Sequence, residues 1–154
     1  TVVMAGDDAS ITIPAMFIEG TDGDTLNAAI TSSATPVVVS LHGYGRMGRS
    51  SQLLAGGRNR DLAAHLARCI GIPGFEVIAD LDDIPTELRG MHRENPVNRP
   101  AMAGTQLELP SRVRGISPRS QPPAGDGLSP ATAALIAGLA RAAKTWQGAA
   151  DAEA

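Results

Sequence analysis

Apolar residues in the central part of the chain recur first at strand spacing and then at helix spacing. Segments 36–41, 52–55, 75–79 and 105–109 have strand character, and weaker strand character occurs at 1–5 and 11–18. In the strongest of these, Val37, Val38 and Val39 are three consecutive β-branched residues, which favour the extended conformation. Such a continuous apolar run predicts a strand that is buried on both faces.

Two segments have helical spacing. In 59–70, Leu62, Leu66 and Ile70 recur every four residues, and Asn59 is a candidate N-cap. Segment 129–148 begins with Ser129 at the N-cap and Pro130 in the first turn, which is a typical helix start. Strands that alternate with helices predict an α/β layer fold.

The domain organisation follows from a change in composition near residue 117. Residues 117–128 are rich in proline, glycine and serine, as in a linker. We therefore expect an α/β domain at 1–116, a linker at 117–128, and a helix at 129–148 that packs on the same domain.

Composition narrows the class of protein. Hydrophobic residues make up 43% and charged residues 19% of the chain, as in globular proteins. The net charge of −3, without a basic stripe, does not favour nucleic-acid binding, and no apolar run is long enough to predict a membrane span. The single cysteine, Cys69, cannot form an internal disulfide, so the sequence is compatible with the cytoplasm or with secretion after leader removal.

Two side chains at strand ends are candidates for chemistry. His42 follows the strongest strand and precedes Gly43; a neutral imidazole there could bind a metal, or it could bond a loop carbonyl as a structural residue. Glu108 points away from the face that holds Leu107 and Leu109. It could face solvent, or it could be a partly desolvated carboxylate that transfers protons in a cleft.

The long segment 80–103 contains three prolines and is typical of a functional loop. Within it, Asn95, Asn98 and Arg99 could hold a substrate that bears carboxylates, because guanidinium groups bind carboxylates with two hydrogen bonds. The other interpretation is a proline-stiffened loop with solvated polar side chains. Arg58, which follows two glycines, has the same two interpretations.

Four motifs in order carry a resemblance to a known family. They are 38–44 (VVSLHGY), 54–60 (LAGGRNR), 95–99 (NPVNR) and 104–109 (GTQLEL), with Arg112 and Arg114 following. Together they resemble the poly-γ-glutamate hydrolases related to phage proteins, a family similar to the zinc carboxypeptidases. The resemblance implies a three-layer α/β fold, in which helices flank a mixed sheet.

The resemblance also implies roles for individual residues. His42 would be a zinc ligand, Glu108 the general base, and Arg58, Asn98 and Arg99 would line the substrate cleft. The implied activity is zinc-dependent hydrolysis of γ-glutamyl amide bonds in an acidic substrate. The alternative is a non-catalytic module that binds an acidic peptide or polymer.

The sequence departs from the family at the metal site. The family supplies a further His and Glu from an upstream motif, yet no histidine precedes His42 here. Because catalytic zinc needs three protein ligands, we expect weak zinc binding and low activity. We interpret the chain as incomplete at its amino terminus, with a degenerate relative as the alternative.

Overall fold

The computed structural model describes residues 37–100, 102–123 and 127–148. The strands expected at 1–5 and 11–18, and the end of the chain at 149–154, lie outside these residues. Within them, no helix has the length and apolar character that crossing a membrane requires.

Four strands form one mixed sheet in the order β1-β4-β2-β3. They are β1 (Val38–Tyr44), β2 (Gln52–Gly56), β3 (Glu76–Ile78) and β4 (Gly104–Pro110). β1 runs parallel to β4, β2 runs parallel to β3, and β2 is antiparallel to β4. Each strand lies where the apolar pattern predicts one, so the mixed α/β class is confirmed.

β1 extends further than its sequence predicts. It continues through His42 and Gly43 to Tyr44, because its parallel pairing with β4 persists to the end of that strand. A Cβ atom at Gly43 would lie 2.7 Å from the guanidinium group of Arg114, which is the far end of a flexible side chain. His42 is therefore part of the strand, and its expected position in the following loop is wrong.

The two predicted helices are confirmed. α2 (Arg60–Cys69) is capped by Asn59, whose side chain accepts a hydrogen bond from the Leu62 N–H at 2.9 Å. α3 (Pro130–Thr145) is capped in the same way by Ser129. Each cap satisfies a backbone donor that has no partner within the helix.

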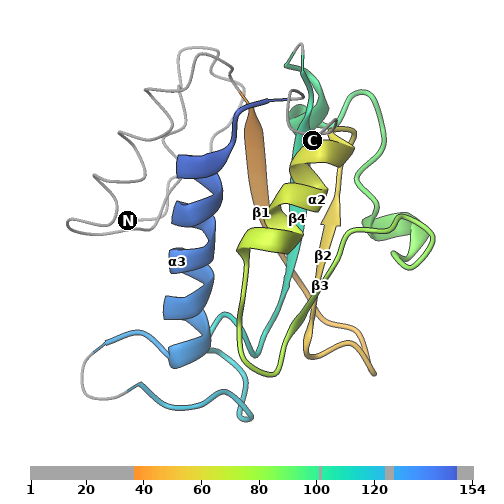
Figure 1. Ribbon diagram of the computed structural model, residues 1–154. Helices are drawn as coiled ribbons and strands as arrows, with labels where there is room; N and C mark the ends of the chain where they lie inside the picture. Colours follow the sequence, from red (N-terminus) through yellow and green to blue (C-terminus); the bar gives the residue numbers. More distant parts are fainter. Residues whose placement is uncertain (1–36, 101, 124–126, 149–154) are drawn as a thin grey trace, which may run out of the picture.

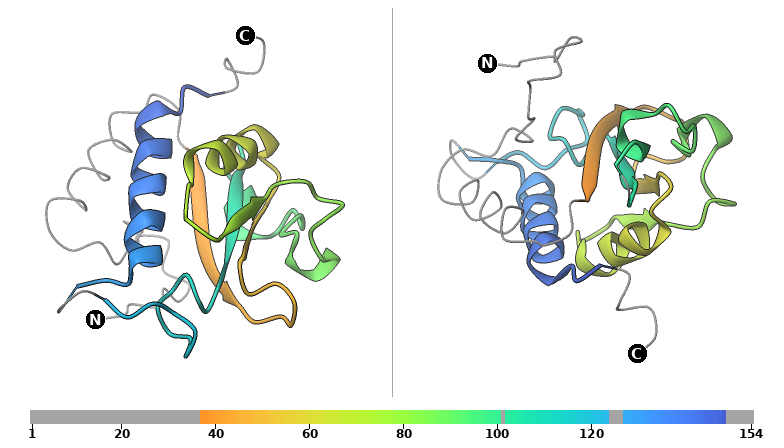
Figure 2. Two further views of the ribbon diagram at one scale, coloured as in Figure 1. Left: turned by 60° about the horizontal axis from the view of Figure 1, so that its bottom comes forward. Right: turned by 90° about the horizontal axis from the view of Figure 1, so that it is seen from above.

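Both helices lie on the same face of the sheet (Figures 1 and 2). The core between helices and sheet contains Leu53 of β2, Leu107 and Leu109 of β4, Leu66 of α2 and Leu135 of α3. The resemblance implies helices on both faces, whereas both α-helices of the described residues are on this one.

The opposite face is covered by the segment between β3 and β4 (Figure 2). This segment contains two 3-10 helices, Thr86–Leu88 and Pro96–Asn98. Ile84 from the segment packs with Tyr44 and Leu54 of the sheet in a second small core. The long loop predicted from its prolines is thus a layer of the structure.

β1 is less buried than its apolar run predicts. Within the described residues β1 is one of the two edge strands of the sheet, and Val38 and Leu41 are 37% and 42% exposed. The expectation of burial on both faces is therefore not met in this part of the chain.

The contact between α2 and α3 includes one of the three histidines. His65 is buried, and its Nε2 atom lies 3.0 Å from the Ala142 carbonyl oxygen and 3.2 Å from the Thr145 hydroxyl. Gly138 allows the close approach, because a Cβ atom there would lie 2.9 Å from the Ile70 Cα atom. His65 is a structural residue, as its position between apolar residues predicts.

Candidate active site

His42 and Glu108 are direct neighbours in the sheet. They are register partners on the parallel strands β1 and β4. Side chains of register partners project from the same face, and neighbouring strands lie about 4.8 Å apart. The parallel pairing therefore brings the two most distinctive candidates of the sequence together.

Glu108 is a buried carboxylate. Its side chain is only 4% exposed, although Leu107 and Leu109 on either side of it point into the helix-side core. Its register partner on β2 is Leu54, which is fully buried. The solvent-facing interpretation of Glu108 is therefore wrong.

Four polar residues occupy adjacent positions on this face of β1 and β4. Ser40 and Gln106 are the register pair two residues before His42 and Glu108. The Ser40 hydroxyl is buried without a hydrogen-bond partner among the described residues. His42 is exposed, and its ring makes no hydrogen bond to any of the described residues. The geometry thus offers an imidazole, a hydroxyl and a carboxylate side by side.

The described residues do not complete a zinc site. A catalytic zinc ion needs three protein ligands, and these residues hold no group of three His, Cys, Asp or Glu side chains. His42 and Glu108 supply at most two metal ligands. The Ser40 hydroxyl beside them is buried and has no hydrogen-bond partner among the described residues, so a further polar atom could bind there.

Tyr44 is coupled electrostatically to Glu108. Its hydroxyl is hydrogen-bonded to the carbonyl oxygens of Arg49 at 2.8 Å and Gln52 at 2.6 Å. Burial raises the pKa of Tyr44 above its ordinary value of 10.0, the Arg49 charge lowers it, and the Glu108 charge raises it. The phenol therefore reports on the charge of the candidate base.

Arg58, Asn98 and Arg99 lie at the other end of the sheet from His42. β2 is antiparallel to β4, so the residues after β2 meet the start of β4, where the Asn59 N–H donates to the Gly104 carbonyl at 3.1 Å. Glu108 is four residues further along, which corresponds to about 13 Å of strand.

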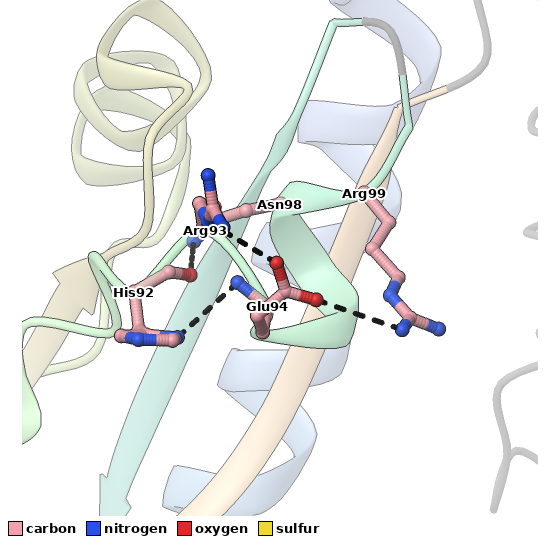
Figure 3. A network of polar contacts seen from close by, with 5 residues as sticks. All are labelled: His92, Arg93, Glu94, Asn98 and Arg99. Carbon is pink, nitrogen blue, oxygen red and sulfur yellow. Dashed lines mark hydrogen bonds and ion pairs between the residues drawn. The ribbon is translucent and has the colours of Figure 1, made fainter.

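Asn98 is fully occupied by the fold. It is 7% exposed, and its side-chain N–H groups donate to the carbonyls of Gly90 at 2.7 Å and His92 at 3.0 Å. Figure 3 shows the contact with His92. Its side-chain oxygen accepts from the Arg58 N–H at 2.9 Å. This amide joins the segment before β4 to the loop after β2.

Arg99 and Arg58 have exposed side chains. Arg99 lies 3.9 Å from the Glu94 carboxylate on an open surface (Figure 3). Such exposed pairs contribute little to stability. Arg58 borders a shallow, open pocket at the start of α2, lined also by Asn59, Arg60, Asp61, Met102 and Trp146.

One residue of the site, Gln106, is not among the sequence candidates, and a second, Asn95, makes a contact other than the substrate binding that the sequence suggests. Gln106 donates from Nε2 to Glu108 Oε1 at 2.7 Å, and Asn95 donates from Nδ2 to Gln106 Oε1 at 2.8 Å. The alternation of 104–109 is the signal for the first, because it places Gln106 on the same face as Glu108. No local pattern indicates the contact of Asn95.

The fold and site define an α/β protein with a buried carboxylate beside an imidazole, toward the carboxyl ends of two parallel strands. The family model of poly-gamma-glutamate hydrolase matches residues 15–117, more than half of the chain. The chain therefore belongs to the poly-γ-glutamate hydrolase family. Comparison with curated proteins and with solved structures found no match.

The titration of Tyr44 tests its proximity to Glu108. The chain has one tyrosine, so phenolate absorbance reports this residue alone. We expect a midpoint above 10.0 in the folded protein and a lower midpoint in Glu108→Gln, which removes a negative charge. The control Glu87→Gln, at an exposed site, should leave the midpoint unchanged. An unchanged midpoint in Glu108→Gln would show that the two groups are not close.

The same shift fixes a pH dependence of stability. A raised pKa means that folding favours the neutral phenol. This contribution is complete below pH 10.0 and is lost as the pH rises through the folded-state pKa.

Substitution of Asn98 separates a structural role from a binding role. Asn98→Ala should lower the free energy of unfolding by about 2 kcal/mol, because buried partners lose their hydrogen bonds. The matched variant Arg99→Ala should change it by less than about 0.5 kcal/mol, as expected at an exposed position. Denaturant unfolding measures both. Equal stability of the two variants would contradict the structural role of Asn98.

Proposed function

We propose that this chain hydrolyses γ-glutamyl amide bonds and that Glu108 transfers the proton. The observation that carries the proposal is the buried Glu108 carboxylate in register with His42 on adjacent parallel strands. Membership of the poly-γ-glutamate hydrolase family supports the choice of substrate.

The proton transfer follows from the chemistry of amide hydrolysis. Glu108 accepts a proton from a water molecule as the water oxygen attacks the amide carbonyl carbon. When the carbon–nitrogen bond breaks, the same carboxyl group returns that proton to the leaving nitrogen. The products are a carboxylic acid and an amine, and Glu108 is regenerated as a carboxylate.

The substrate class fits the charges at the far end of the sheet. Each unit of a γ-glutamyl polymer carries a free carboxylate, and arginine is well suited to bind such groups. Arg58 and Arg99 are exposed there, and Asn98 ties the loop after β2 to the segment that carries Arg99. An extended polymer could contact these arginines while one of its amide bonds reaches Glu108.

We also propose that His42 is a metal ligand and that the metal is zinc. The exposed imidazole beside Glu108 supports this assignment. Further ligands must come from outside the described residues, since these hold no complete ligand group.

A non-catalytic module that binds acidic polymers is the second candidate. It is favoured by the incomplete ligand group and by the exposed arginines. Such a module would bind poly-γ-glutamate in a salt-sensitive manner and release no product. Zinc-dependent product release by this chain would eliminate it.

Substitution of the proposed base tests the hydrolase directly. Glu108→Gln should lower the release of γ-glutamyl products from poly-γ-glutamate by about 10²- to 10⁴-fold, because an amide cannot accept the proton. Glu76→Gln, at an exposed position on β3, should keep the wild-type rate. Product release is measured chromatographically with zinc present. Full activity in Glu108→Gln would exclude Glu108 as the base.

Zinc titration tests the role of His42. His42→Ala should weaken zinc binding by tenfold or more, on the order expected for loss of a metal ligand. His92→Ala removes an exposed loop imidazole and should leave the affinity unchanged. Equilibrium dialysis with metal analysis measures both variants. Identical affinities would remove His42 from the metal site.

A further inference from the structure

A chain of side-chain amides ends on the Glu108 carboxylate. We infer that Gln106 is a positioning residue for Glu108 and that Asn95 sets the direction in which the Gln106 amide points. The inference rests on the proposed role of Glu108 as the proton-transfer group. It adds two residues to the site, neither of which needs to touch the substrate.

The contacts are short and mostly buried. Asn95 Nδ2 donates to Gln106 Oε1 at 2.8 Å, and Gln106 Nε2 donates to Glu108 Oε1 at 2.7 Å. Gln106 is 7% exposed, so water cannot easily replace either contact. Because an amide has a donor end and an acceptor end, the direction of the chain matters.

The direction is set by the backbone. The Val97 N–H donates to Asn95 Oδ1 at 3.3 Å, and a backbone N–H can only donate. Asn95 must therefore turn its Nδ2 group toward Gln106, and the Gln106 Oε1 atom accepts this hydrogen bond. The remaining NH₂ group of Gln106 then faces Glu108, so the series ends in a donor on a carboxylate.

Gly90 confines the Gln106 amide from the other side. A Cβ atom at Gly90 would lie 3.0 Å from both Cδ and Oε1 of Gln106. Gly90 also has a φ of +63°, which residues with a side chain rarely adopt. The backbone of the covering segment thus packs directly against the amide and limits its rotation.

This arrangement gives the two carboxylate oxygens different roles. Oε1 is held by the Gln106 donor, whereas Oε2 makes no hydrogen bond within the described residues. Gln106 therefore fixes the orientation of Glu108 and leaves Oε2 for the reaction.

Removal of the donor is the first test. Gln106→Met keeps the length of the side chain but loses the N–H group, and kcat should fall about ten- to hundredfold with KM little changed. Gln52→Met is the matched control: Gln52 also bridges a donor and a glutamate, namely Arg49 and Glu76, outside the site.

Reversal of the amide direction is the second and sharper test. Asn95→Asp can still cap the 3-10 helix Pro96–Asn98, but it offers only acceptors to Gln106. The Gln106 amide should then turn its NH₂ group toward residue 95 and its oxygen toward Glu108. We expect kcat to fall about tenfold or more. Gln52→Glu makes the same change from amide to carboxylate outside the site and should keep kcat.

A readout without catalysis separates this inference from the proposed function. The Gln106 side-chain NH₂ resonances should move from their wild-type positions in Glu108→Gln and in Asn95→Asp, because each substitution changes the group to which this NH₂ donates. If the Gln106 resonances keep their wild-type positions in both variants, the inference is wrong, regardless of the activity of the variants. If Glu108→Gln abolishes turnover while Gln106→Met and Asn95→Asp keep wild-type kcat, the positioning role is wrong and the proposed function stands. Full turnover in Glu108→Gln would instead contradict the proposed function and, with it, the catalytic role of the two amides, while the resonances would still decide the direction of the Gln106 amide.

Discussion

The register between β1 and β4 is the constraint on which the site depends. The parallel pairing sets His42 beside Glu108 and Ser40 beside Gln106. A slip of one residue would turn a strand's side chains to the opposite face and bury its polar residues against the helices. Leu107 and Leu109 resist such a slip, because both are needed in the core beneath α2 and α3. The same apolar positions that stabilise the fold therefore align the polar ones.

Burial of β4 explains the layer on the other face. Every residue of β4 is buried, including Gln106 and Glu108. Buried polar groups without partners are costly, so the segment before β4 must supply hydrogen bonds as well as apolar contacts. It does so with Asn95, while Ile84 packs on Leu54 beside the polar residues. The segment before β4 is therefore held in place by hydrogen bonds to buried polar groups as well as by hydrophobic packing.

Much of the fold could be predicted from local pattern, and less of the site. Spacing and caps identify both helices, and alternation assigns Glu108 to the face opposite Leu107. The continuation of β1 through His42 depends on pairing with a strand more than sixty residues away, which no local pattern reveals. The separation of Arg58 from Glu108 depends on the antiparallel direction of β2, which is also non-local. The position of Gln106 could have been predicted, since the alternation that places Glu108 on this face of the sheet places Gln106 there too.

The two ends of the sheet share one hydrogen-bonded segment. The Gly90 carbonyl accepts from Asn98, which holds the loop of Arg58, and at longer range from Asn95, which orients the amide that reaches Glu108. Residues 90–98 thus join the exposed arginines to the buried carboxylate through backbone and amide contacts. Because buried amides of this kind have all their partners inside the protein, a shift of one contact must be taken up by its neighbours. The segment that ends at Arg99 is therefore the same segment that orients the candidate base through Asn95 and Gln106.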